Sequence, residues 1–268
     1  MIRLLKIELN KIIYNRTIWV ILGLYIVLFA PVAFGFDNIL KSFSAANARH
    51  QQSGMADLIQ QGYSVFNFPG VWHNLAYLAS WFKLLLALII ITIVTNEYTY
   101  KTLRQNIIDG LSKWEIIWAK ELVILVFSIV AVILLVILTL ILGNSQSNVS
   151  MFTGSSILFV YFFTLILYFN LAYFLSSWLK KSGFVFGILI LYTVIIENVA
   201  AAKLSANIAR FLPMHLIGYM IPNPMSKLVG QNPESDFSIL NIGIGVFYIA
   251  LFIALNFLLL KKGHAGKQ

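Results

Sequence analysis

Six long apolar segments constrain what this chain can fold into. A helix that crosses the hydrocarbon core of a bilayer needs about 20 mostly apolar residues, and lipid accepts few other backbone arrangements. The segments recur along the chain, at residues 18–36, 78–95, 122–143, 157–179, 184–202 and 239–260. Of the 268 residues, 60% are hydrophobic and 11% are charged, which is about half the charged share of an average soluble domain. The sequence therefore predicts an all-α polytopic membrane protein with six transmembrane helices.

The distribution of positive charge predicts how these spans are oriented. Six spans place both termini on one side of the membrane, and positively charged segments favour the cytoplasm. With both ends inside, thirteen Lys and Arg residues fall on inner segments and five on outer ones, namely Lys41, Arg49, Lys203, Arg210 and Lys227. We therefore expect cytoplasmic termini. The net charge of +9 then reflects topology, and we expect no nucleic-acid partner.

Residues 1–17 form a separate element in this prediction. A helix over these residues gathers apolar side chains on one face, from Ile2, Leu5, Leu9, Ile12 and Ile13. The basic side chains of Arg3, Lys6 and Arg16 lie away from that face. This pattern is typical of an amphipathic helix in the membrane interface, with its basic side toward lipid headgroups. The alternative is a basic flank that only orients the first span.

The inner connector at residues 96–121 is long and patterned, although a few residues would join two spans. Apolar side chains recur in it at helical spacing, from Tyr100, Leu103, Ile107, Ile108 and Leu111. Glu97 precedes Lys101 by four residues, which is the favourable order for an ion pair on a helix. A solvated linker between helices is the alternative to a rigid element.

The second half of the connector carries signals for a break and a new helix. Asp109-Gly110 interrupts the pattern, since glycine tolerates the left-handed conformation that ends helices. Ser112 and Glu115 have the spacing of a capping box, in which each side chain meets a free backbone N–H at a helix start. The connector is therefore predicted as helix, break and capped helix into the third span.

Two charged residues lie inside predicted spans, about five residues from their outer ends. Lys83 is in the second span and Glu197 is in the fifth. A charge at the centre of a span costs about 2.5–3.5 kcal/mol, and the cost falls near the interface. Their matched depth leads to the hypothesis of an ion pair near an outer gate. Separate snorkelling of each side chain is the alternative.

Two outer loops, residues 37–77 and 203–238, are longer than connections usually are, and loops of this length generally have structure or function. The second contains Pro213, Pro222, Pro224 and Pro233. Because proline breaks helices, we expect short broken helices that dip into the outer leaflet.

Features of an enzyme are absent from the sequence. It has no cysteine, its four histidines are scattered without an HExxH pattern, and no GxxxxGK[ST] phosphate loop occurs. We therefore expect no catalytic, cofactor or metal site, and any ATP hydrolysis has to take place on another chain.

The connector resembles the inner loop of type-two ABC transporter permeases, the membrane subunits of many bacterial ATP-driven exporters. The resemblance lies in Asn96-Glu97-Tyr98, in Lys101-Thr102-Leu103-Arg104-Gln105, and in Gly110, Ser112 and Lys120. The layout of an interfacial helix, six spans and a long outer segment before the last span is similar as well. The loop at 37–77 is longer than in the smallest members, which bears on the substrate.

The resemblance implies that the connector is a coupling helix docked into a groove of a separate ATPase subunit. By position it assigns this role to Glu97, Thr102, Arg104, Gln105 and Gly110. It further implies that residues 18–268 form a permease domain in a bacterial inner (plasma) membrane, paired with an identical or a sister permease chain. Such a complex exports a peptide, lipid-like or drug-like substrate by alternating access. An ion-coupled carrier or channel, or a peptide-binding immunity subunit that does not transport, are the alternatives.

Overall fold

The computed structural model describes residues 2–48, 66–144, 150–223 and 238–265. Over these ranges the chain is helical without a β-strand, and an isolated bridge joins Asn67 to Asn144. The elements are α1 (Ile2–Ile13), α2 (Arg16–Ala48), α4 (Gly70–Thr99), α5 (Thr102–Ile108), α6 (Lys113–Leu142), α7 (Ile157–Leu179), α8 (Ser182–Leu191), the π-helical η1 (Tyr192–Ile196), α9 (Glu197–Lys203), α10 (Ala206–Ala209), α11 (Pro213–Met220) and α12 (Ile239–Ala265).

Six helices in the described part are long and apolar enough to cross a membrane. They cover Arg16–Phe36, Gly70–Thr99, Lys113–Leu142, Ile157–Leu179, Ser182–Lys203 and Ile239–Lys261. Each contains one of the six predicted segments, at least in large part. The prediction of an all-α polytopic membrane protein is confirmed.

Two helices around the first outer loop are longer than expected. The helix α2 continues past the first span to Ala48, and α4 begins at Gly70, eight positions before the predicted start of the second span at Leu78. Polar residues hid this start, because His73 and Asn74 interrupt the apolar run. Helix α4 buries Asn74, while the His73 ring lies 2.8 Å from the carbonyl oxygen of Pro222. Residues 49–65 of the predicted loop lie outside the described ranges.

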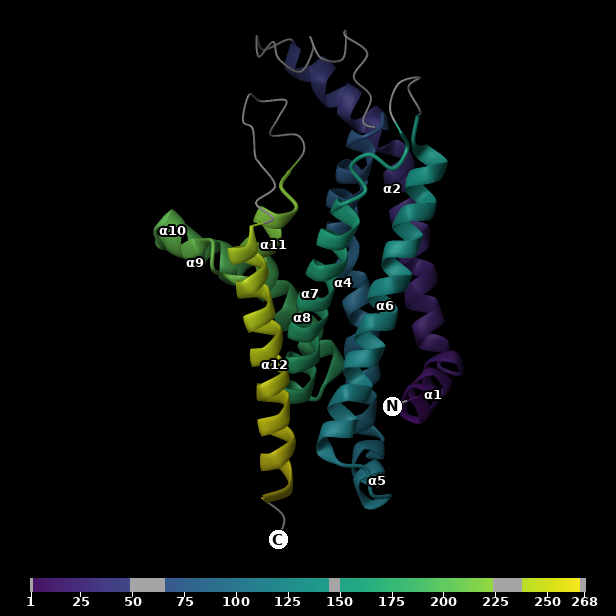
Figure 1. Cartoon of the computed structure of the whole chain (residues 1–268), viewed down its shortest axis with the longest axis vertical. Helices are drawn as coiled ribbons and strands as arrows, with labels where there is room; N and C mark the ends of the chain where they lie inside the picture. Colours follow the sequence, from purple (N-terminus) through teal and green to yellow (C-terminus); the bar gives the residue numbers. More distant parts are fainter. Residues whose placement is uncertain (1, 49–65, 145–149, 224–237, 266–268) are drawn as a thin grey trace.

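The bundle has two distinct ends (Figure 1). Helices α1 and α5 lie at the same end as the C-terminal end of α12, at the bottom of the view. We call this the α5 end. The short helices α10 and α11 lie in the opposite half, which we call the α11 half, and α9 and α10 project sideways from the bundle. The connector and both chain termini therefore share one end, as an even number of spans requires.

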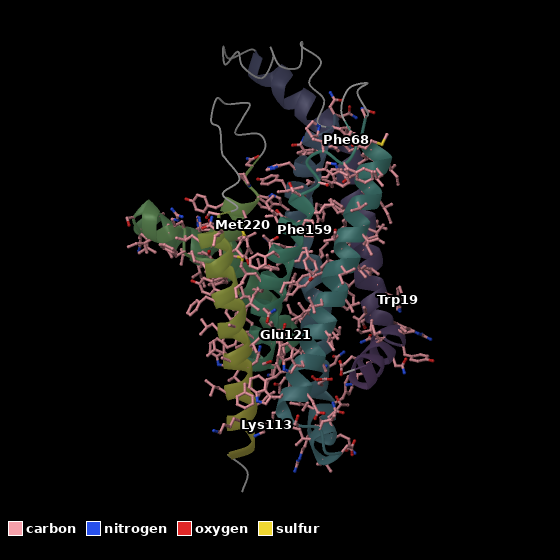
Figure 2. All side chains as sticks on the ribbon, viewed as in Figure 1. Trp19, Phe68, Lys113, Glu121, Phe159 and Met220 are labelled. Carbon is pink, nitrogen blue, oxygen red and sulfur yellow. The ribbon has the colours of Figure 1, made fainter. Side chains whose placement is uncertain are left out.

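Helix α7 is the centre of the packing. It contacts α4, α6, α8, α11 and α12, and it buries the large side chains of Tyr161, Tyr168 and Phe169 completely. Aromatic side chains each bury a large apolar area and so contribute strongly to such a core. Phe159, near the start of the same helix and labelled in Figure 2, is instead 75% exposed. The aromatic residues of the fourth span therefore serve mainly in contacts between helices.

The predicted N-terminal and outer helices are present. In α1, Leu9 and Ile12 pack inward as expected, but Ile13 is 55% exposed; the side chains of residues 2–7 lie outside those described. In the second outer loop, Pro213 begins α11 and Pro222 follows its end. Proline suits a helix start, because its missing N–H would have had no partner there. Pro224 and Pro233 fall outside the described residues.

Candidate functional site

The predicted connector forms a short helix between two defined breaks at the α5 end. Helix α4 ends at Thr99, and Lys101 (φ 57°) turns the chain into α5. After α5, Gly110 adopts a φ of 94°. Ser112 Oγ then accepts the Glu115 N–H at 3.2 Å, and Glu115 Oε2 accepts the Ser112 N–H at 2.8 Å. The predicted sequence of helix, break and capped helix is confirmed.

One face of α5 is fixed to the bundle. Leu103 and Ile107 pack with Leu111 on a small apolar cluster that comprises Ile116, Ile117 and Leu260. Through this cluster α5 contacts the start of α6 and the end of α12. The Trp114 ring of α6 also stacks on Phe257 of α12, with centroids 4.4 Å apart. The connector is therefore attached to two different spans.

The opposite face of α5 is free of contacts with the described bundle. Thr102, Arg104 and Gln105 are exposed, and Ile108 keeps 70% of its surface. Gly110 is exposed at the end of the helix. Four of the five residues assigned to coupling therefore lie on one accessible element, and Ile108 adds an apolar side chain that the resemblance did not assign.

The fifth assigned residue, Glu97, is buried in a cluster of four charges. The cluster consists of Glu8 and Lys11 from α1, Glu97 from α4 and Lys120 from α6. Each lysine amine contacts both carboxylates, with N–O distances between 2.5 and 2.8 Å. Glu8, Glu97 and Lys120 are 3–5% exposed. This charge cluster joins the N-terminal helix to the second and third spans on either side of α5.

The charge cluster corrects one expectation about the connector. The predicted partner of Glu97, Lys101, lies after the end of α4 in a left-handed conformation. Helical spacing between the two residues is lost there, and the structure gives Glu97 the amines of Lys11 and Lys120 instead. A small cavity of about 40 Å³ separates the cluster from α5 and is lined by Glu8, Glu97 and Asn106.

Mutual attraction stabilises the charged forms in this cluster. Burial of the Glu8 carboxyl opposes its ionisation, but attraction to Lys120 and Lys11 outweighs this effect and holds its pKa below the ordinary 4.5. Burial likewise opposes the charge on Lys11, yet Glu97 and Glu8 raise the pKa of its amine above 10.5. Two positive and two negative charges cancel, so the cluster is neutral as a whole.

A further buried carboxylate lies next to Lys120 in the sequence. Glu121 Oε2 accepts a hydrogen bond from Asn170 Nδ2 of α7 at 3.1 Å. Figure 2 shows Glu121 among the helices of the bundle, farther from the α5 end than Lys113. Its other oxygen, Oε1, has no hydrogen-bond partner among the described groups. Helix α6 therefore carries a polar contact into the apolar region.

Lys83 and Glu197 form no direct salt bridge, although the charge of Glu197 acts on the Lys83 amine through space; each has a different direct partner among the described residues. The Lys83 amine lies 5.1 Å from the centroid of the Tyr168 ring. Glu197 Oε1 accepts the backbone N–H groups of Met214 at 2.5 Å and His215 at 2.8 Å. The carboxylate thus satisfies the free N–H groups at the start of α11. Lys83 lies thirteen positions after the start of α4, because this helix begins eight residues before the predicted span.

Sequence reasoning missed most of the charge cluster. It counted Lys11 and Lys120 among the thirteen positive charges of the inner segments, gave Lys120 a place in the permease resemblance, and did not consider Glu8 or Glu121. The spacing of Glu8 and Lys11 within α1, three residues apart, was an available signal for a helical ion pair. Of the residues that the structure describes, no group of three or more His, Asp or Glu side chains is placed to hold a metal ion.

The fold defines a class, an all-α multi-pass membrane protein whose second and third spans are joined by a docked connector helix. A protein-family model described as a protein of unknown function (DUF2705) matches residues 56–263. The match covers α4 through most of α12, and the chain belongs to this family. Helix α1 and the cluster residues Glu8 and Lys11 precede the matched region. No curated protein matches the chain.

Proposed function

We propose that the protein is the permease subunit of an ATP-driven exporter of the ABC class. A separate ATPase subunit docks on the exposed face of α5 and supplies the energy, because the permease has no nucleotide-binding loop. A second permease chain, identical or related, completes the pathway. The cargo is a peptide, a lipid-like or a drug-like molecule moved outward by alternating access. The protein lies in a bacterial inner membrane with both termini in the cytoplasm.

The observation that carries this proposal is the attachment of α5. Its inner face is packed on α6 and α12, and the charge cluster holds the adjoining ends of α4 and α6 to α1. A helix fixed on one side and exposed on the other moves as a body with the spans that it joins. A force that a docked partner applies at Arg104 or Ile108 would therefore be transmitted to two neighbouring spans and would not merely deform a loop.

The chemistry of the exposed face favours a protein partner. It combines a guanidinium, an amide and a large apolar side chain, from Arg104, Gln105 and Ile108. Arginine is enriched among the residues that contribute most to protein interfaces, where its planar group makes several hydrogen bonds. A plain solvated linker has no need of an exposed isoleucine.

Copurification tests the proposal. The chain is co-expressed with stand-alone ABC ATPases from the same genome, and each complex is purified through a tag on the ATPase. We expect the chain to copurify and ATP hydrolysis in proteoliposomes to depend on it. Arg104→Glu should weaken the complex by about tenfold or more, because a charge reversal at an interface arginine costs over 1.4 kcal/mol.

The matched control reverses another exposed cation at the same end. Lys181 follows Lys180, whose amine lies 5.4 Å from the centroid of the Tyr98 ring near the end of α4. Lys181→Glu should leave the complex intact. Equal binding by wild type and Arg104→Glu, or no association with any ABC ATPase, would refute the proposal.

An ion-coupled carrier is a second candidate, and Glu121 is the observation in its favour. A buried carboxylate within a span, hydrogen-bonded to Asn170, is a typical feature of proton paths. Transport driven by a proton gradient in liposomes without ATP, and lost in Glu121→Gln, would establish this function instead. A peptide-binding immunity subunit would bind its peptide without moving it under either energy source.

A further inference from the structure

A cavity of about 480 Å³ lies in the α11 half of the bundle, away from the charge cluster. It is bounded by α4, α7, η1 and α11, and its walls include Tyr77, Trp81, Lys83, Tyr168, Thr193 and His215. Cavities of roughly 300–1,000 Å³ with mostly apolar walls and a few convergent polar groups are typical binding sites for small molecules. The proposed coupling surface uses none of these residues.

Lys83 is the polar centre of this cavity. It is buried at 9% exposure in the middle of a membrane-spanning helix. Its amine stacks over the Tyr168 ring and forms no ion pair with a described residue. A cation inside a span costs about 2.5–3.5 kcal/mol, and a cation–π contact offsets part of that cost. Such a group has a strong affinity for an anion that enters the cavity.

Glu197 attracts the Lys83 amine through space but makes no direct salt bridge with it. Glu197 does not line the cavity, and its Oε1 is committed to the backbone N–H groups of Met214 and His215. Two of the residues that line the cavity, Tyr168 and Thr193, carry hydroxyl groups. Tyr168 and Thr193 place their oxygens 3.3 Å apart, and both residues line the cavity with Lys83. Thr193 Oγ1 donates to the Leu189 carbonyl at 2.8 Å, so the Tyr168 hydroxyl is the one of the two that can turn to donate to a ligand.

The cavity opens toward the surface that faces lipid. Trp81 of α4 and Val194 of η1 line it and are also 68% and 57% exposed. Both belong to membrane-spanning helices. The π-helical turn of η1 widens the backbone at this point, and such turns frequently occur at functional sites. A molecule in the bilayer can therefore enter from the side, with its apolar part along Trp81 and Val194.

We propose that this cavity binds an amphiphile with one anionic group, a phosphate or a carboxylate. The anion pairs with Lys83 and accepts a hydrogen bond from the Tyr168 hydroxyl, which turns away from Thr193, and the apolar chain extends toward Trp81. A bilayer lipid and an exported amphiphile share this chemistry. Only the designation of the ligand as cargo rests on the proposed export function; binding itself does not require an ATPase.

A fluorescent fatty acid tests this binding without the ATPase. The full chain is purified in a neutral detergent and titrated with 11-(dansylamino)undecanoic acid, whose emission rises in an apolar site. We expect saturable binding. Lys83→Met should weaken it by about tenfold or more, since loss of one partner of a buried charge pair costs about 2–5 kcal/mol. Lys83→Arg retains the charge and should bind within about threefold of wild type, a difference of under 1 kcal/mol.

A second probe and a control variant distinguish loss of the contact with the anion from misfolding of the Lys83→Met variant. The amide of the same dansyl acid, which lacks the charge, should bind the wild type about tenfold more weakly. Lys181→Met removes a cation at the α5 end and should bind the acid as wild type does. Equal binding of acid and amide, or unchanged binding by a folded Lys83→Met, would overturn the proposal.

Competition then distinguishes the two sources of the ligand. Displacement of the probe by phosphatidylglycerol but not by phosphatidylcholine supports the site and assigns it to an anionic bilayer lipid. Retention of the probe in the presence of phosphatidylglycerol supports the site and assigns it to another acidic amphiphile. Neither result depends on whether an ABC ATPase binds α5, so the site and the export function can fail separately.

Discussion

At the scale of single residues, Glu97 is where the connector and the spans are most tightly linked. One oxygen, Oε1, accepts the amines of both Lys11 and Lys120, so a single carboxylate ties α4 to α1 and α6. Breaking a buried ion pair costs more than the pair contributes, because the remaining partner is left as an uncompensated charge. Removal of this one charge therefore affects three helices at once.

We predict that Glu97→Gln lowers the free energy of unfolding by about 3 kcal/mol. Adding Lys120→Met should restore much of this loss, because Glu8 and Lys11 then remain as a neutral ion pair. Asp109→Asn, at an exposed carboxylate of the same connector, is the control and should change stability by under about 0.5 kcal/mol. Unfolding by titration with sodium dodecyl sulfate in mixed micelles measures all three. A Glu97→Gln variant as stable as Asp109→Asn would contradict the account.

The pKa shift of Glu8 predicts a dependence of stability on pH. Its pKa in the folded protein lies below the ordinary 4.5, so the unfolded chain takes up the proton first as the pH falls. The stabilisation is complete above pH 4.5 and is lost as the pH falls toward the lower value of the folded state. Thermal melts of wild type and Glu8→Gln should therefore differ at pH 7 and converge in this acidic range. A constant difference down to the lowest pH would show that Glu8 acts by packing alone.

Single residues also show what the sequence could and could not predict. The capping box of Ser112 and Glu115 was predictable, because both halves lie within one turn and depend only on local spacing. The cluster partners Glu8 and Lys120 are 112 positions apart. Their contact depends on how α1 packs against α6, and no local pattern encodes that packing. For the same reason Lys83 and Glu197 were assigned to each other on depth alone, and each has a different partner.

At the scale of elements, the connector depends on the break at Gly110. Its φ of 94° is a conformation that side chains with a Cβ rarely adopt. No atom outside its own neighbours lies within 4 Å of where a Cβ would be placed. A side chain at this position would strain the backbone without a steric clash. The change in stability caused by a substitution therefore measures the conformational requirement of the turn.

We predict that Gly110→Ala destabilises the turn by about 1–2 kcal/mol, the cost of a left-handed conformation for an L-residue. Gly187→Ala is the matched control: it lies inside α8, likewise has open space, and should be neutral or slightly stabilising. Hydrogen–deuterium exchange of residues 102–111 measures the opening of α5 in each variant. Faster exchange in Gly187→Ala than in Gly110→Ala would contradict this prediction.

The existence of the elements was more predictable than their ends. Each span follows from a run of apolar residues, which is a strong local signal. The ends of α2 and α4 were wrong by many residues, because these helices extend beyond the apolar segment. At about 1.5 Å per residue, the 30 residues of α4 are longer than the hydrocarbon core is thick. Contacts within the protein stabilise the part of the helix beyond the apolar segment; the Trp72 indole N–H, for example, donates to the Met151 carbonyl at 2.8 Å.

At the scale of the whole molecule, sidedness is the property on which the export proposal rests. The fold places α5 and both chain termini at one end, and from the excess of Lys and Arg on these segments we expect that end to face the cytoplasm. The chain has no cysteine. A single introduced cysteine is therefore labelled against a silent background.

We predict opposite labelling of two cysteine variants in intact cells. Thr153→Cys, in the exposed turn before α7, should react with a maleimide that does not cross membranes. Arg104→Cys should react only after the membrane is permeabilised. The labelling is carried out in cells that lack the ATPase, so that no partner covers Arg104→Cys. The reverse pattern would place α5 outside the cell and end the coupling proposal.

The packing of α5 on α12 has a consequence for how the protein is made. Leu103 and Ile107 leave the ribosome long before Ile253, Phe257 and Leu260, which supply part of the surface that covers them. During translation the connector therefore has an uncovered apolar side until the last span has been inserted. Under the export proposal, an ATPase needs this packed surface, so premature termination within α12 is expected to give a protein that inserts into the bilayer yet binds no ATPase.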